Sequence, residues 1–198
     1  MVPQSCEACG LWKSCKTYQL RVEVSERCDY EFEETILVVG GHPSQVDDFR
    51  AGVYHKDTLR GQFLREFVLD NLPAKWVLTT AARCYGKEIT PEQYQLCSEN
   101  LAAVISEHKP YIVIALGLDA LASIVGPGTN SSAPIKVEKA SGEIMWVIPS
   151  FPPEDHVGSE ATKKYDGKHN LADHIVSLIE WVESLLNKRY NTQEFTYE

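Results

Sequence analysis

Four short apolar runs rich in β-branched residues divide the chain. Each run is mostly continuous rather than alternating, which is typical of strands buried on both faces of a parallel sheet. Turn-forming residues and polar stretches separate them, so each is short enough to be a strand. We therefore predict strands at residues 35–40 (TILVVG), 76–81 (WVLTTA), 111–117 (YIVIALG) and 144–149 (IMWVIP).

Helical patterns lie between the four runs. The sequence TPEQ at residues 90–93 combines an N-cap threonine, a proline in the first turn and a glutamine that completes a capping box. That helix is expected to continue towards His108 and to end before Pro110. Further helices are expected after Asp57, where Leu59, Phe63, Phe67 and Val68 recur at helical spacing, after Gly117, and over residues 171–187.

The alternation of strands and helices predicts an α/β fold, namely a three-layer α/β/α sandwich around a central four-stranded parallel sheet. The length of 198 residues fits one domain, which we place at residues 1–189 and which includes the N-terminal cysteine segment, followed by a polar tail at 190–198. Loops are expected at residues 126–134 and 150–167. Ligands of such sheets bind at the carboxyl ends of the strands, and that edge is where we expect a site.

The chain is acidic, with a formal net charge of −9 and a pI of about 5.2. This balance argues against a general nucleic-acid coat protein, because phosphate neutralisation requires lysine and arginine. Several basic residues fall within one stretch of the chain, and we interpret them as a solvated face rather than a groove. They are Arg50, Lys56, Arg60, Arg65, Arg83 and Lys87. No apolar run is long enough to span a membrane and the N-terminus lacks an apolar signal core, so we expect a cytoplasmic protein without membrane contact.

Six cysteines are many for a cytosolic chain, where thiols stay reduced and clustered cysteines more often bind metal. Cys6-x2-Cys9 and Cys84-x12-Cys97 form two pairs whose four thiolates suit either zinc or an iron–sulfur cluster. A rival grouping is a local zinc site on Cys6, Cys9, Cys15 and Cys28. In a third interpretation Cys84 and Cys97 are simply buried apolar residues. Spacing alone leaves zinc and a cluster equally favoured.

Several motifs occur in a fixed order over residues 6–155. The motifs are CEAC at 6–9, VVGGHPSQVDD at 38–48, LTTAARC at 78–84, TPEQYQLC at 90–97, KPYIVIALGLDAL at 109–121 and VIPSFPPED at 147–155. Together they resemble the iron–sulfur (family 4) uracil-DNA glycosylases. The resemblance implies a uracil-DNA glycosylase-like fold, a four-iron four-sulfur cluster on Cys6, Cys9, Cys84 and Cys97, and a role in DNA repair. Cys15 and Cys28 have no counterpart in the pattern.

The side chains that such glycosylases use for catalysis are replaced in this chain. Where the family carries a glutamate, a histidine and a uracil-reading asparagine, this sequence has Gly41, Phe151 and Thr80. Because each replacement removes a charged or hydrogen-bonding group, we expect uracil excision to be weak or absent. His42 is the candidate catalytic residue, and His156 is a second polar candidate. The expected substrate pocket consists of Gly41, His42, Tyr54, Thr80, Gly117 and Phe151.

These observations favour an iron–sulfur protein that handles DNA, a nucleobase or a nucleotide without efficient uracil excision. One alternative is a DNA glycosylase or base-modifying enzyme that acts on a base other than uracil. Another is an accessory subunit of replication or repair that binds a protein partner, which the acidic balance mildly favours.

Overall fold

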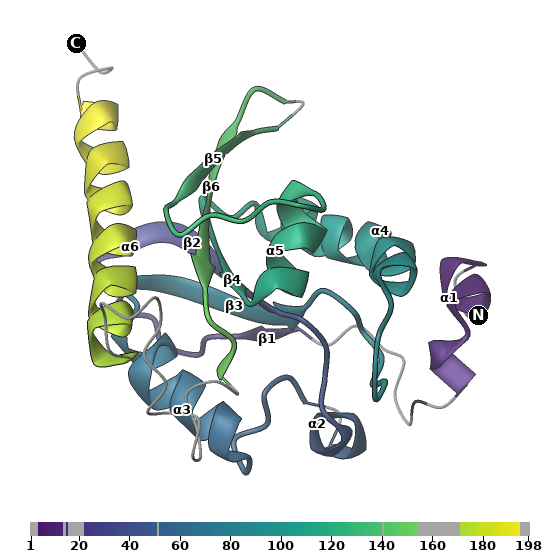
Figure 1. Ribbon diagram of the computed structural model, residues 1–198. Helices are drawn as coiled ribbons and strands as arrows, with labels where there is room; N and C mark the ends of the chain where they lie inside the picture. The colour runs from purple at the N-terminus through teal and green to yellow at the C-terminus, as the bar shows by residue number, and fades with distance from the viewer. Residues whose placement is uncertain are drawn as a thin grey trace.

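A computed structural model describes residues 4–13, 15, 22–50, 52–139, 141–153 and 171–194. It contains a six-stranded mixed sheet in the order β1-β3-β2-β4-β6-β5, with helices on both sides (Figure 1). The predicted α/β class is therefore confirmed, whereas the sheet has six strands rather than four. The strands are β1 (Glu23–Val24), β2 (Phe32–Gly40), β3 (Ala74–Thr80), β4 (Ile112–Leu116), β5 (Ile135–Glu138) and β6 (Ile144–Ser150).

The four predicted strands are the central four, and they are mutually parallel. Neighbours pair in the order β3, β2, β4 and β6, while β1 and β5 join the two edges antiparallel. The two edge strands escaped prediction because β1 has two residues and β5 is only half apolar. The sheet is mixed for this reason, and its parallel part remains in the centre.

Two helices cover each face of the sheet, which explains why the strand sequences are continuously apolar. Ile36 and Val38 of β2 face a core shared with α3 (Leu59–Phe67) and α6 (Leu171–Glu194). Leu37 and Val39 face the opposite core, shared with α4 (Pro91–His108) and α5 (Leu118–Val125). Consecutive side chains of a strand point to opposite faces, so a strand between two helix layers has no solvent-facing position.

The cap prediction for α4 is confirmed. The Thr90 side chain accepts from the Gln93 amide, and the Gln93 side chain accepts from the Thr90 amide. The helix ends at His108, where Lys109 takes a left-handed conformation before Pro110. Residues 126–134 form a loop, as predicted, and the loop predicted at 150–167 lies mostly outside the described residues.

The apolar stripe predicted for α3 is rotated from the expected position. Leu59 and Phe67 are exposed, and Leu64 and Val68 are the residues that face the core. At the surface the rings of Phe63 and Phe67 stack with centroids 5.0 Å apart, which shields part of their apolar area from water.

Helix α6 continues to Glu194, beyond its predicted end at residue 187. Arg189 explains the extra turns, because it pairs with Glu34 at 2.9 Å and lies 4.3 Å from the centre of the Tyr111 ring. Tyr190 packs edge-on against Phe32. Residues 190–194 of the predicted polar tail are therefore helical, and 195–198 lie outside the described residues.

Four short helical segments were not predicted from the sequence. Two of them lie in the N-terminal cysteine segment, and one follows β2 at the edge where ligands were expected. None of the helices in the described ranges is long and apolar enough to cross a membrane. The short segments are α1 (Gln4–Cys9), η1 (Leu11–Lys13), α2 (Gln45–Arg50) and η2 (Leu69–Asn71).

Candidate functional site

The carboxyl ends of the parallel strands bring five of the six predicted pocket residues to one edge of the sheet. Gly40 is paired with Thr80, so Gly41 and His42 leave β2 beside the end of β3. On the other side, the Gly117 amide donates to the Ser150 carbonyl at 2.8 Å, which places Phe151 next to Gly117. Gly117 has a φ of +92°, a conformation that other residues rarely adopt, and Pro152 packs against it.

Tyr54, the sixth predicted residue, lies below this edge as part of the core. It is only 2% exposed, and its hydroxyl end occupies the space where a side chain at Gly40 would lie. The Arg60 guanidinium covers its ring at 4.7 Å from the centroid. In this structure Tyr54 therefore supports the end of β2 instead of presenting an open aromatic face.

Asp47, which the sequence analysis did not select, organises the loop between β2 and α3. It is fully buried, and its Oδ1 accepts from the His55 amide at 2.7 Å. Its Oδ2 accepts from the Ser44 amide at 2.8 Å and forms an ion pair with Arg60. Burial alone would raise the pKa of Asp47, but the bonds from His55 and Ser44 and the charge of Arg60 hold it below its usual range. The S-x-x-D pattern at residues 44–47 is the signal that could have identified it.

His42 is joined to two further side chains that the sequence analysis also missed. Its Nδ1 lies 2.9 Å from the Tyr94 hydroxyl, which donates to Asp119 Oδ2 at 3.2 Å. Burial, followed by the charge of Asp119, raises the pKa of Tyr94. Asp119 follows a strand end and could have been selected on that ground, whereas nothing in the sequence connects Tyr94 with His42.

Two other predicted residues of the edge, Thr80 and Phe151, make local contacts. The Thr80 hydroxyl donates to the Ala82 carbonyl at 2.8 Å in a buried position. The half-buried Phe151 ring meets the His174 ring edge-on, with centroids 4.7 Å apart. His174 also lies 3.2 Å from the Ser150 hydroxyl, and burial lowers its pKa. His156 lies outside the described residues.

The four predicted metal ligands come from three places in the fold: Cys6 and Cys9 lie on α1, Cys97 lies on α4, against which α1 packs, and Cys84 follows β3. Cys6, Cys84 and Cys97 are buried and Cys9 is half-buried. Burial raises the pKa of the Cys84 thiol, and the nearby Cys15, Cys97 and Cys6 raise it further. Burial likewise raises the pKa of Cys97, with further contributions from Cys9 and Cys6. Each of these two thiols is therefore influenced by cysteines from a distant segment of the chain.

Arg83 directly precedes Cys84, and its surroundings bear on whether the four cysteines fit a metal group. Burial lowers its pKa, while Cys6, Cys97 and Cys84 raise it. Its Nε is buried without a hydrogen-bond partner among the described residues, so one donor is left for a sulfur acceptor. Within the same residues, no three His, Cys, Asp or Glu side chains lie close enough to bind one metal ion. The donor chemistry nevertheless fits a thiolate-bound group, because soft sulfur ligands select zinc or iron–sulfur clusters.

The two remaining cysteines differ from each other. The Cys15 thiol donates to the Tyr85 carbonyl at 3.5 Å, next to Cys84. Cys28 is exposed, and its thiol contacts the Glu26 carbonyl at 3.7 Å. The rival zinc grouping requires Cys28 as its fourth ligand, and the exposed position of Cys28 does not favour it.

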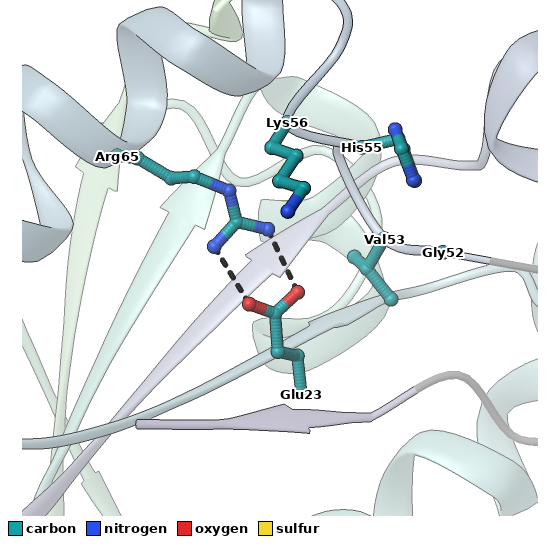
Figure 2. Close-up of a pocket in the computed structure, with 6 residues that line it drawn as sticks. All are labelled: Glu23, Gly52, Val53, His55, Lys56 and Arg65. Carbon is teal, nitrogen blue, oxygen red and sulfur yellow. Dashed lines mark hydrogen bonds and ion pairs between the residues drawn. The ribbon is translucent and has the colours of Figure 1, made fainter. Parts of the chain in front are cut away.

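A cavity of about 230 Å³ lies between β1, α3 and the loop that precedes α3, and none of the six predicted pocket residues lines it (Figure 2). Arg65 bridges the cavity with two bonds to Glu23, at 2.6 and 2.7 Å. The neighbouring basic residues are paired as well, Arg60 with Asp47 and Arg50 with Asp57. Three arginines of the basic stretch are therefore each compensated by a carboxylate. The cavity is lined by Glu23, Gly52, Val53, His55, Lys56 and Arg65.

No protein-family model matches the chain, and no curated protein matches it.

Proposed function

We propose that this chain is an iron–sulfur protein of the uracil-DNA glycosylase type that holds a nucleobase of DNA at the carboxyl edge of its sheet. The observation that carries the proposal is the packing of α1, which contains Cys6 and Cys9, against α4, which contains Cys97. Cys84 follows β3, whose last residue, Thr80, lies at the candidate site. A metal group at this position would hold the N-terminal segment beside the same edge.

The residues that would hold the cluster are Cys6, Cys9, Cys84 and Cys97. A bound four-iron four-sulfur cluster supplies a structural link between segments, and Arg83 offsets part of the negative charge that four thiolates bring. The unpartnered Nε of Arg83 supplies a donor to sulfur, an interaction that tunes and stabilises such sites. Zinc on the same four cysteines is the alternative.

The nucleobase would lie against Phe151 and near His42. Phe151 is half-buried, and an aromatic face stacks on a base with roughly 1–3 kcal/mol of stabilisation. Because Gly41, Thr80 and Phe151 do not offer the groups that assist uracil release, we propose binding without efficient uracil excision. Cleavage at a different base is the alternative, and the bonded group of His42, Tyr94 and Asp119 favours it.

Anaerobic purification followed by visible spectroscopy and metal analysis tests this proposal. We expect a brown protein that contains iron and acid-labile sulfide and binds a single-stranded oligonucleotide. Cys84→Ser should lose the iron, because the buried Cys84 is a proposed ligand. The matched control Cys28→Ser changes an exposed thiol and should keep it. One zinc per chain without iron would contradict the cluster, and absence of oligonucleotide binding would contradict the function.

A further inference from the structure

Three side chains from three elements form a continuous hydrogen-bonded chain at the carboxyl edge of the sheet. Asp119 lies in the first turn of α5, Tyr94 in the first turn of α4, and His42 directly after β2. The Tyr94 hydroxyl is central, 3.2 Å from Asp119 Oδ2 and 2.9 Å from His42 Nδ1. Tyr94 is buried, with 8% of its surface exposed, whereas His42 is only half-buried.

The proton positions in this chain follow from the number of donors. An ionised carboxylate only accepts, so the single proton of the Tyr94 hydroxyl is directed at Asp119. The hydroxyl oxygen must then accept from His42, which places the imidazole proton on Nδ1. A neutral imidazole with its proton on Nδ1 has an unprotonated Nε2. Asp119 and Tyr94 therefore select the tautomer in which Nε2 is the basic atom.

Gly41 is part of the same arrangement. A Cβ atom at position 41 would lie 3.2 Å from the Tyr94 hydroxyl and 3.7 Å from the Cβ of Asp119. The first distance is shorter than ordinary van der Waals contact, so a side chain at position 41 would press on the hydroxyl that orients His42. A glycine at position 41 therefore leaves room for the hydrogen bonds that join His42, Tyr94 and Asp119.

We infer that His42 is the general base of an N-glycosidic hydrolysis, with Tyr94 and Asp119 as positioning residues. This inference rests on the proposed function, because it requires a DNA nucleotide at the same edge. The oxygen of a water molecule attacks C1′ of the nucleotide, and the C1′–N bond breaks with its electron pair leaving on the base. The water proton passes to His42 Nε2 and from there to the departing base, so the products are the free base and an abasic sugar.

Base release from defined oligonucleotides tests the catalytic role. The probes are single-stranded oligonucleotides with one hypoxanthine, xanthine or 7-methylguanine, and the wild-type protein should release at least one of these bases. His42→Gln should lower that rate by about 100-fold or more, because a general base typically contributes this factor. Tyr94→Phe and Asp119→Asn should each lower it roughly 10-fold, as expected when an orienting partner is lost. His108→Gln and Tyr190→Phe are matched controls, because neither residue belongs to the hydrogen-bonded group of His42, Tyr94 and Asp119. Both variants should keep the wild-type rate.

The imidazole tautomer provides a second measurement that a purely structural role would not change. Nitrogen-15 chemical shifts should show His42 protonated at Nδ1 in the wild-type protein. In Tyr94→Phe, whose melting temperature is measured in parallel, both tautomers should be populated. Wild-type protonation at Nε2 would overturn the inference.

The outcomes of this test are distinct from those of the proposed function. Equal release rates in the wild type and His42→Gln would overturn the general-base role. So would a protein that holds iron and binds the oligonucleotides but releases no base from any probe, although the proposed function would then stand. A protein without iron and without oligonucleotide binding would overturn the proposed function itself.

Discussion

Single residues at the carboxyl edge determine which chemistry this sheet can support. Gly41 has no side chain, and the Thr80 hydroxyl is already bound to the Ala82 carbonyl. Phe151 packs against His174 and offers no hydrogen-bond donor of its own. Uracil departs as an anion and is helped by donors and polar groups in these positions. The proposed site therefore lacks that help at three of its residues.

We expect excision of uracil from single- or double-stranded DNA to be undetectable or very slow. Each missing group is worth several kcal/mol in the transition state, and a loss of about 3 kcal/mol already lowers a rate by roughly 100-fold. The measurement is release of uracil from an oligonucleotide with one uracil, compared with an unrelated active glycosylase as a positive control. Rapid turnover by a preparation free of contaminating glycosylase would contradict this expectation.

The sequence located part of the candidate site, and the reason lies in how its residues are connected. Gly41, His42, Thr80, Gly117 and Phe151 could be selected because each follows or ends an apolar run. Asp119 also follows such a run, but its bond to Tyr94, and the bond of Tyr94 to His42, could not be predicted, since they join residues 25 and 52 positions apart in the chain. Such contacts are products of tertiary packing and leave no period in the sequence.

Among the elements, the helices α3, α4, α5 and α6 could be predicted, and the short α2 could not. A six-residue helix has little intrinsic stability, and most of its stabilisation comes from tertiary contacts. The contacts here converge on Asp47, which binds Ser44, His55 and Arg60. One buried carboxylate thus holds together α2, the loop that follows it and α3.

The stability that Asp47 contributes should depend on pH. Its pKa in the folded protein lies below the ordinary value of 3.8, so its contribution is present above that pH and is lost as pH falls through the lower, folded value. Asp47→Asn should flatten the loss of stability in this acidic window. At pH 7 it should cost about 3 kcal/mol or more, because Arg60 is then left largely buried without its charge partner.

Thermal unfolding monitored by circular dichroism between pH 7 and pH 2.5 measures both effects. Asp29→Asn is the matched control, since Asp29 pairs with Arg27 at the surface, where ion pairs contribute little. Equal melting temperatures for Asp47→Asn and the wild type at pH 7 would show that the buried pair does not stabilise the loop.

For the whole molecule, the distribution of charge bears on how DNA would be bound under the proposed function. The net charge is −9, and Arg50, Arg60 and Arg65 are each paired with a carboxylate. These three cations are therefore less available to replace the counterions of phosphates. Recognition in the proposed function consequently relies on the base and on local contacts more than on the DNA backbone.

Binding of a single-stranded oligonucleotide should accordingly depend weakly on salt. With two or three phosphate contacts, the slope of log K against log salt concentration should be about −2 or shallower. Fluorescence anisotropy titrations between low and moderate salt measure this slope. A steep slope, about −5, would show an extensive cationic surface and contradict the compensated arrangement.

The centre of the fold was accessible from the sequence, and its periphery was not. A strand covered by helices on both faces must be apolar at every position, so the four central strands appear as continuous runs. The N-terminal α1 is different, because its position depends on packing against α4. Contacts of that kind appear only when the chain is folded.

The edge strands have a consequence for how copies of this protein meet. An open sheet edge exposes unpaired amide and carbonyl groups that can recruit a strand from another molecule. Here one edge, β1, is only two residues long. At the other edge β5 alternates half-buried Ile135 and Val137 with exposed Lys136 and Glu138. An incoming strand would have to align with those charges at β5, and it would find only two residues to pair with at β1. The sheet is open at both edges, yet both edges disfavour amyloid-like polymerisation.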